Sequence, residues 1–280
     1  MVEPSFVAIA ENFKAVLLDS YGVLKNYKGV IEGAKESIQY LRDKGVVMRV
    51  LTNDASRSQE QQSDGFKKIG LDFTPDEIIT SGMMAKQFLE HKILSGKIAY
   101  LGTDNSAEYI LRAGLDHIAV RDIDLTDVDD ISAFVFLDDE GFDWNMDINK
   151  TVNLLRRKSI PIIVANSDKL YPVSKKDVAV ATGGIAQLVE SMLSKHFIHF
   201  GKPDSQMFMY AFDNLNKTNE FNKNEILMVG DTLHTDILGG NKFGVKTLLV
   251  LTGNTRLENA ESVINSSGII PDYICMSIGG

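Results

Sequence analysis

The sequence contains a single cysteine, Cys275, among 280 residues. One thiol excludes a disulfide framework within the chain and any zinc site that takes several cysteines from one chain. The sequence also has no apolar run long enough to span a bilayer, and its first residues lack the basic and apolar regions of a secretion signal. We therefore expect a cytoplasmic protein with no membrane partner.

Positive charge is also scarce. The chain has 29 Lys and Arg residues against 38 Asp and Glu residues, a formal net charge of −9. A protein that binds the phosphate backbone of nucleic acid needs the opposite balance, so nucleic acid is not an expected partner. Hydrophobic residues make up 44% of the chain, which is enough for one large core or two modest ones.

Short apolar runs alternate along the chain with amphipathic helical stretches. The clearest strand-like runs are residues 15–18, 46–51, 133–138, 160–166, 226–230 and 246–251. A helix is expected up to about Lys44, where Gly45 would end it, and Ser56 is the expected cap of the next helix. Continuous apolar strands between helices are typical of an α/β fold with a parallel sheet covered on both faces.

Polar side chains follow the ends of several of these strands. Asp19 ends the first strand, Thr52 the second, and Asp231 a later one that Asp236 closely follows. The carboxyl ends of parallel strands meet at one sheet edge, so these groups should lie together, with Lys202 on a loop between them. Carboxylates suit Mg²⁺, and Asp19 can attack phosphorus while Thr52 and Lys202 hold the phosphoryl oxygens. The pattern predicts a metal and phosphate site.

Four motifs resemble those of the haloacid dehalogenase (HAD) superfamily. They are residues 19–24 (DSYGVL), 51–53 (LTN), 201–203 (GKP) and 230–236 (GDTLHTD). The long insertion between the second and third motifs is similar to that of the class IIA, NagD-like branch. The resemblance implies a Rossmann-like core at 1–82 and 196–280, and an inserted C2-type α/β cap at 83–195.

The resemblance also implies the roles of individual residues. The catalytic residues would be Asp19, as the nucleophile, with Tyr21 and Lys202. Mg²⁺ would be held by Asp19, Asp231, Asp236 and the backbone carbonyl of Tyr21. The remaining candidates would bind substrate or its phosphate: Thr52, Asn53, Asp54 and Lys202 from the core, and Asn166, Asp168 and Tyr171 from the cap. The substrate would be a small phosphorylated metabolite, and class IIA relatives suggest a homodimer formed through the cap.

Tyr21 departs from the family pattern. HAD phosphatases carry a second Asp at this position as general acid and base, a role typically worth roughly 10²–10⁴-fold in rate. A tyrosine there is similar to the motif of haloacid dehalogenases, which need no metal, and to a class IIA subgroup with an aromatic residue at this position. Three hypotheses stay open: a Mg²⁺-dependent phosphatase, a dehalogenase-type hydrolase that uses Asp19, and a phospho-ligand-binding protein with weak or no turnover.

Overall fold

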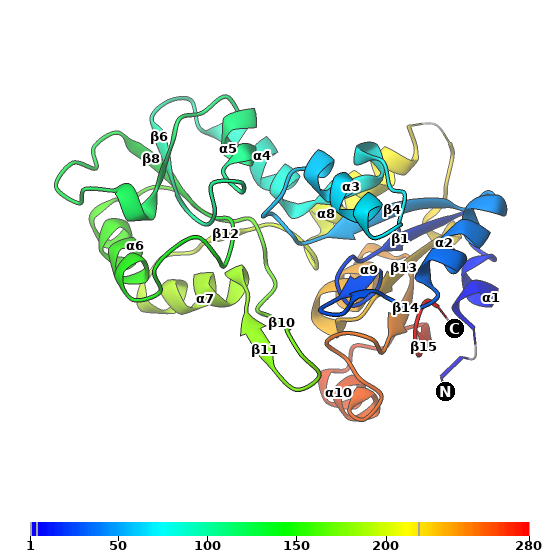
Figure 1. Cartoon of the computed structure of the whole chain (residues 1–280). Coiled ribbons are helices and arrows are strands. Elements are labelled where there is room, and N and C mark those ends of the chain that lie inside the picture. The colour runs from blue at the N-terminus through cyan, green and yellow to red at the C-terminus, as the bar shows by residue number, and fades with distance from the viewer. Residues whose placement is uncertain (1, 4, 218, 280) are drawn as a thin grey trace.

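The computed structural model describes residues 2–3, 5–217 and 219–279. Its two large sheets lie side by side and belong to separate lobes (Figure 1). The lobe built on the six-stranded sheet is called the first lobe, and the lobe built on the five-stranded sheet is called the second lobe. The fold is therefore α/β with parallel sheets, as the alternating pattern predicts. No helix among the described residues combines the length and the apolar character that crossing a membrane requires.

The first sheet has six parallel strands in the order β15-β14-β13-β1-β4-β5. Their bounds are β1 Ala15–Leu18, β4 Val47–Thr52, β5 Ile78–Thr80, β13 Ile226–Gly230, β14 Lys246–Val250 and β15 Tyr273–Cys275. Strand β1 lies between β13 and β4, and all four of its residues are buried. Its end is thus enclosed by neighbouring strands that point the same way.

Side chains of β1 alternate between two hydrophobic clusters. Leu17 packs in a cluster with Phe208 of helix α8 (Ser205–Leu215), whereas Leu18 packs with Phe6 of α1 (Phe6–Ala10) and Leu41 of α2 (Ala34–Asp43). Both faces of the strand are covered, which explains why its sequence is continuously apolar instead of alternating.

The α-helices of the described residues are α1 Phe6–Ala10, α2 Ala34–Asp43, α3 Gln59–Lys68, α4 Ser81–Lys92, α5 Glu108–Arg112, α6 Met146–Arg157, α7 Thr182–Met192, α8 Ser205–Leu215, α9 Leu238–Phe243 and α10 Ala260–Ser267.

The second sheet has five parallel strands in the order β12-β9-β8-β6-β7. They are β6 Lys97–Leu101, β7 His117–Ala119, β8 Ile131–Phe136, β9 Ile162–Val164 and β12 Ile198–His199. Strand β12 pairs with β9 although it lies beyond residue 195, so this sheet continues past the boundary that the resemblance implies. Helices α6 and α7 pack on one of its faces (Figure 1).

Two short antiparallel pairs stand outside the large sheets. Strands β2 Lys25–Asn26 and β3 Gly29–Val30 form a turn directly after β1. Strands β10 Leu170–Pro172 and β11 Val178–Val180 form a hairpin that reaches from the second lobe toward α10 of the first (Figure 1). Both pairs border the carboxyl edge of the first sheet, where the predicted site lies.

Candidate active site

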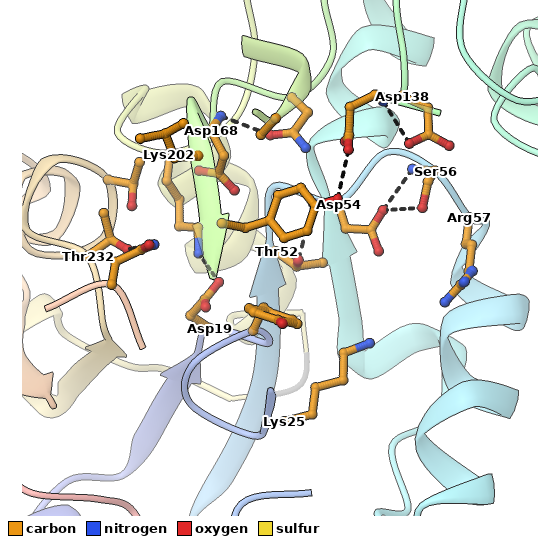
Figure 2. A pocket seen from close by; sticks show the side chains of 18 of the residues that line it. Asp19, Lys25, Thr52, Asp54, Ser56, Arg57, Asp138, Asp168, Lys202 and Thr232 are labelled. Carbon is orange, nitrogen blue, oxygen red and sulfur yellow. Dashed lines mark hydrogen bonds and ion pairs between the residues drawn. The ribbon is translucent and has the colours of Figure 1, made fainter. Parts of the chain in front are cut away.

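A pocket of about 500 Å³ lies at the carboxyl edge of the six-stranded sheet. Its walls come from both lobes, because residues that follow β1, β4 and β13 face residues that follow β8 and β9 across it (Figure 2). Most of the residues predicted from sequence line this pocket: Asp19, Tyr21, Thr52, Asp54, Asn166, Asp168, Tyr171, Lys202, Asp231 and Asp236. The structure thus brings together segments that are far apart along the chain.

Three buried carboxylates meet at the floor of the pocket. Asp19, Asp231 and Asp236 each offer an oxygen within 4.8 Å of the others. Burial raises the pKa of Asp19 well above its usual value, and burial followed by the charge of Asp236 raises that of Asp231 to about 7. Such crowding of hard oxygen ligands is what a bound Mg²⁺ relieves, so these residues fit a magnesium ion.

Two glycines allow the carboxylate of Asp231 to sit close to the backbone. A Cβ at Gly22, whose φ is +92°, would lie 2.4 Å from Asp231 Oδ2, and a Cβ at Gly253 would lie 1.8 Å from the same atom. Any side chain at either position would displace the carboxylate. The oxygens of Asp231 accept hydrogen bonds from the Asn254 amide at 2.6 Å and the Thr232 hydroxyl at 2.9 Å, which fix its orientation.

Lys202 is the cation of this floor. Its Nζ donates to Asp19 Oδ1 and lies 2.7 Å from Asp236 Oδ1 (Figure 2). Burial alone would lower its pKa, but the carboxylates of Asp19 and Asp236 more than offset that effect and raise the pKa. The lysine is therefore charged at neutral pH, and one ammonium faces three acids.

Asn53 supports the pocket without lining it. Its Oδ1 accepts from the Lys202 amide at 2.7 Å, and its Nδ2 donates to the Lys202 carbonyl at 3.0 Å and to Asp168 Oδ1 at 2.8 Å. This asparagine thus ties the Lys202 loop to a residue of the second lobe. Asp168 lies half-buried in the same place, and its partial removal from solvent raises its pKa to about 6.

The loop after β4 corrects one expectation about the next helix. Ser58, not Ser56, caps α3, since its hydroxyl accepts from the amide of Gln61 at 3.4 Å. Ser56 instead donates its amide and hydroxyl to Asp54 Oδ1, at 2.8 and 2.6 Å. An Asx-type turn therefore occupies the position where the sequence suggested a helix start, and Ser56 acts as a donor to Asp54 there instead of accepting from the amides of the helix.

Tyr21 contacts the hairpin that crosses from the second lobe. Its hydroxyl donates to the Pro172 carbonyl at 2.6 Å, and its ring packs edge-on against Tyr171, with 6.1 Å between ring centroids. Tyr171 in turn donates to Asp139 Oδ2 at 2.9 Å. Burial raises the pKa of Tyr21 above its ordinary value, so its hydroxyl stays protonated.

Neither histidine near the motifs reaches the pocket. His234 is exposed, and His199 pairs at the surface with Glu190 at 3.2 Å. The pocket-lining residues contain no histidine. Histidine therefore does not replace, in this pocket, the general-acid Asp that is missing at position 21.

Several lining residues were not predicted from sequence. They are Lys25, Asn26, Arg57, Thr103, Asn105, Asp138, Asp139, Glu140, Thr232, Thr235 and Asn254, with the apolar Leu137, Leu170 and Ala181 and the loop residue Ser56. The acids after β8 had a signal, because they end an apolar strand just as Asp19 does. Lys25 and Arg57 had none, since a lone cation beside a motif reads as an ordinary surface residue.

Comparisons with known proteins agree with this geometry. Residues 16–116 match the family model of haloacid dehalogenase-like hydrolases, and residues 199–279 match a second, HAD-hydrolase-like model. The chain is 52% identical to a crystal structure described as a "possible sugar phosphatase, HAD superfamily" from Cytophaga hutchinsonii, with a TM-score of 0.95 and coverage of 100% of this chain and 99% of that one.

Two further relatives are more distant. The glycerol-3-phosphate phosphatase of Gallus gallus is 28% identical, over 97% of this chain and 91% of that protein. A glycerol phosphate phosphatase from Mycobacterium tuberculosis, solved in complex with magnesium, shares the fold at 23% identity, with a TM-score of 0.76 and coverage of 99% and 78%. The chain belongs to the haloacid dehalogenase superfamily, in its class IIA, NagD-like branch.

Proposed function

We propose that this chain is a Mg²⁺-dependent phosphatase that hydrolyses a small phosphorylated metabolite through an aspartyl phosphate on Asp19. The observation that carries the proposal is the meeting of Asp19, Lys202, Asp231 and Asp236 in one buried cluster. Relatives named as phosphatases, one of them solved with magnesium, support the same activity.

The proposed reaction has two steps. A carboxylate oxygen of Asp19 forms a bond to phosphorus while the ester P–O bond breaks, and the leaving oxygen takes a proton from a water molecule to become the alcohol. Water then attacks the acyl phosphate, which releases inorganic phosphate and regenerates Asp19. Lys202 and the Thr52 hydroxyl would bind the phosphoryl oxygens as charge redistributes.

Mg²⁺ would be held by Asp19, Asp231, Asp236 and the Tyr21 carbonyl, where it would neutralise phosphoryl charge. Asp54, Asn166, Asp168 and Tyr171 would contact the rest of the substrate, and Asn53 would position Lys202 and Asp168. The carboxylate cluster speaks against the dehalogenase alternative, because attack on carbon needs no metal. A measurement of the turnover rate distinguishes a phosphatase from the alternative, a binding protein with weak or no activity.

Phosphate release from a panel of phosphate esters tests the proposal. With millimolar Mg²⁺ the wild type should release phosphate from at least one alkyl phosphate and from 4-nitrophenyl phosphate, and a chelator should abolish the release. Asp19→Asn should lose activity by at least about 10³-fold, because an amide is a poor nucleophile. Release that survives in Asp19→Asn, or no release by the wild type, contradicts the proposal.

The arrangement of the chain adds two smaller proposals. Residues 83–195 would act as the C2-type cap over a core formed by 1–82 and 196–280.

The cap would also form a homodimer interface, because α7 and the β10–β11 hairpin expose Leu188, Met192, Val178 and Val180. Sedimentation equilibrium of Leu188→Glu against wild type tests the dimer. A cytoplasmic location remains a prediction from the sequence.

A further inference from the structure

The charged side chains of the pocket differ in how many hydrogen-bond or ion-pair partners the protein gives them. The Asp54 carboxylate accepts from Ser56 and, at 2.6 Å, from Gln62. Asp138 accepts from the Thr103 hydroxyl at 2.8 Å, and from the backbone amide that follows it at 2.9 Å. Neutral donors of the protein thus bind and orient both of these carboxylates.

Lys25, in contrast to these acids, has no close partner of opposite charge among the described residues. It stands on β2 directly after the first motif, lines the pocket, and is only partly exposed. Its Nζ lies 5.3 Å from the centre of the Phe66 ring, and no carboxylate of the described residues lies within 4 Å of it. Burial lowers the pKa of Lys25, although the more distant carboxylates of Asp54 and Asp19 act in the opposite direction.

Arg57 adds a second cation on the same side. It follows β4, lines the same pocket, and its guanidinium forms no ion pair with the described residues. Figure 2 shows Lys25 and Arg57 on the opposite side of Asp19 from Thr232. Lys202 differs from both, because two carboxylates already neutralise it.

We propose that the substrate carries a second anionic group, a carboxylate or a second phosphate, at the end away from the transferred phosphoryl group, and that Lys25 and Arg57 bind it. The inference rests on the proposed function for the identity of the first group. A pocket of about 500 Å³ accommodates a metabolite of a few carbons with both groups. Charge-assisted hydrogen bonds to a partly buried cation are strong enough to select such a substrate.

Titration calorimetry with three non-hydrolysable phosphonates of matched length tests this directly, in Mg²⁺. Propylphosphonate has one anionic group, 3-phosphonopropionate adds a carboxylate, and ethane-1,2-bisphosphonate adds a second phosphonate. The wild type should bind one of the two doubly anionic ligands roughly 10- to 100-fold more tightly than propylphosphonate. The preferred ligand identifies the second group as a carboxylate or a phosphate.

Variants assign the preference to residues. Lys25→Met should reduce the ratio of the two affinities to about one, and Arg57→Met, at an exposed position, should reduce it in part. Lys28→Met removes the same charge outside this pocket and should leave the ratio unchanged. Thermal unfolding shows whether Lys25→Met remains folded; if it does not, Arg57→Met carries the test.

The two proposals fail in different ways. A wild type that binds all three phosphonates equally, or a Lys25→Met variant that weakens all three by the same factor, overturns the second anionic group. Neither result depends on turnover. Absence of phosphate release from every ester, with the affinity ratio intact, overturns the phosphatase and leaves the binding inference standing.

Discussion

At the scale of single residues, Tyr21 is where this chain departs from its family. Its hydroxyl donates to the Pro172 carbonyl, so its proton is committed to the hairpin and not to the leaving group of a substrate. A phenol with a raised pKa is also a poor base at neutral pH. We infer that the wild type lacks a strong proton carrier at this position.

Tyr21→Asp should therefore raise kcat. The gain should be at least about tenfold on an alkyl phosphate, equivalent to about 1.4 kcal/mol of barrier, because the acid would protonate the leaving oxygen in the first step and activate water in the second. It should be smaller on 4-nitrophenyl phosphate, because that leaving group needs little protonation and only the second step benefits. Tyr21→Phe is the control, because it removes the hydroxyl without adding an acid. Rates that stay the same or fall for both substrates in folded Tyr21→Asp would show that this position does not limit the reaction.

Asp138 predicts a dependence of stability on pH. Burial raises its pKa from 3.8 to about 6, so the folded state binds more protons than the unfolded state between these values. The free energy of unfolding should thus fall as the pH rises from about 4 to about 6, and this loss persists at neutral pH. The full shift is worth about 3 kcal/mol, and solvent at the pocket reduces it to about 1–2 kcal/mol.

Asp138→Asn measures this contribution. Asparagine can keep both contacts, since its oxygen accepts from the amide of residue 139 and its amide donates to a rotated Thr103 hydroxyl. Urea unfolding should find the variant about 1–2 kcal/mol more stable at pH 7 and nearly equal to wild type at pH 4. A variant that is equally or less stable at pH 7 contradicts the assignment.

Which residues could be predicted depends on how local their signal is. Asp19 and Asp231 end buried parallel strands, and that pattern alone places them at one edge of the sheet. Asn254 orients Asp231 through its backbone amide, which leaves no mark in the sequence. Lys25 and Arg57 were missed because only the folded structure shows that both line the pocket.

At the scale of elements, the β10–β11 hairpin joins the two lobes. The Arg256 guanidinium, near α10, donates to the Lys175 carbonyl and, at 3.4 Å, to the Ser174 carbonyl in the hairpin turn. With the contact from Tyr21, three hydrogen bonds from the first lobe hold an element of the second. The hairpin is thus ordered by the other lobe as well as by its own short ladder.

Arg256→Met should free this turn. Loss of its hydrogen bonds lowers the local opening free energy by about 1–1.5 kcal/mol, so trypsin should cut after Lys175 or Lys176 roughly 5- to 10-fold faster. Arg157→Met is a matched control, because Arg157 also donates to a loop carbonyl, that of Leu125, at 2.7 Å. Unchanged cleavage in Arg256→Met, or equal acceleration in Arg157→Met, contradicts this role.

At the scale of the whole molecule, the sequence predicted the α/β class and the parallel sheets, because period and turn signals act locally. It could not predict how the lobes meet. One hydrophobic cluster runs from Leu51 of the first sheet through Leu89 of α4 to Tyr100 of the second. That continuity, and a pocket lined from both lobes, depend on packing between segments that are distant in sequence.

The central claim is that Asp19 carries the phosphoryl group. Because Tyr21 replaces the residue that would activate water, the second step should be slow and the aspartyl phosphate should accumulate. Wild-type protein turning over 4-nitrophenyl phosphate in Mg²⁺, quenched in acid and analysed by peptide mass spectrometry, should carry a phosphoryl group on Asp19 that Asp19→Asn lacks. Continued turnover with no phosphoryl group on Asp19, or with one on another side chain, would contradict the account.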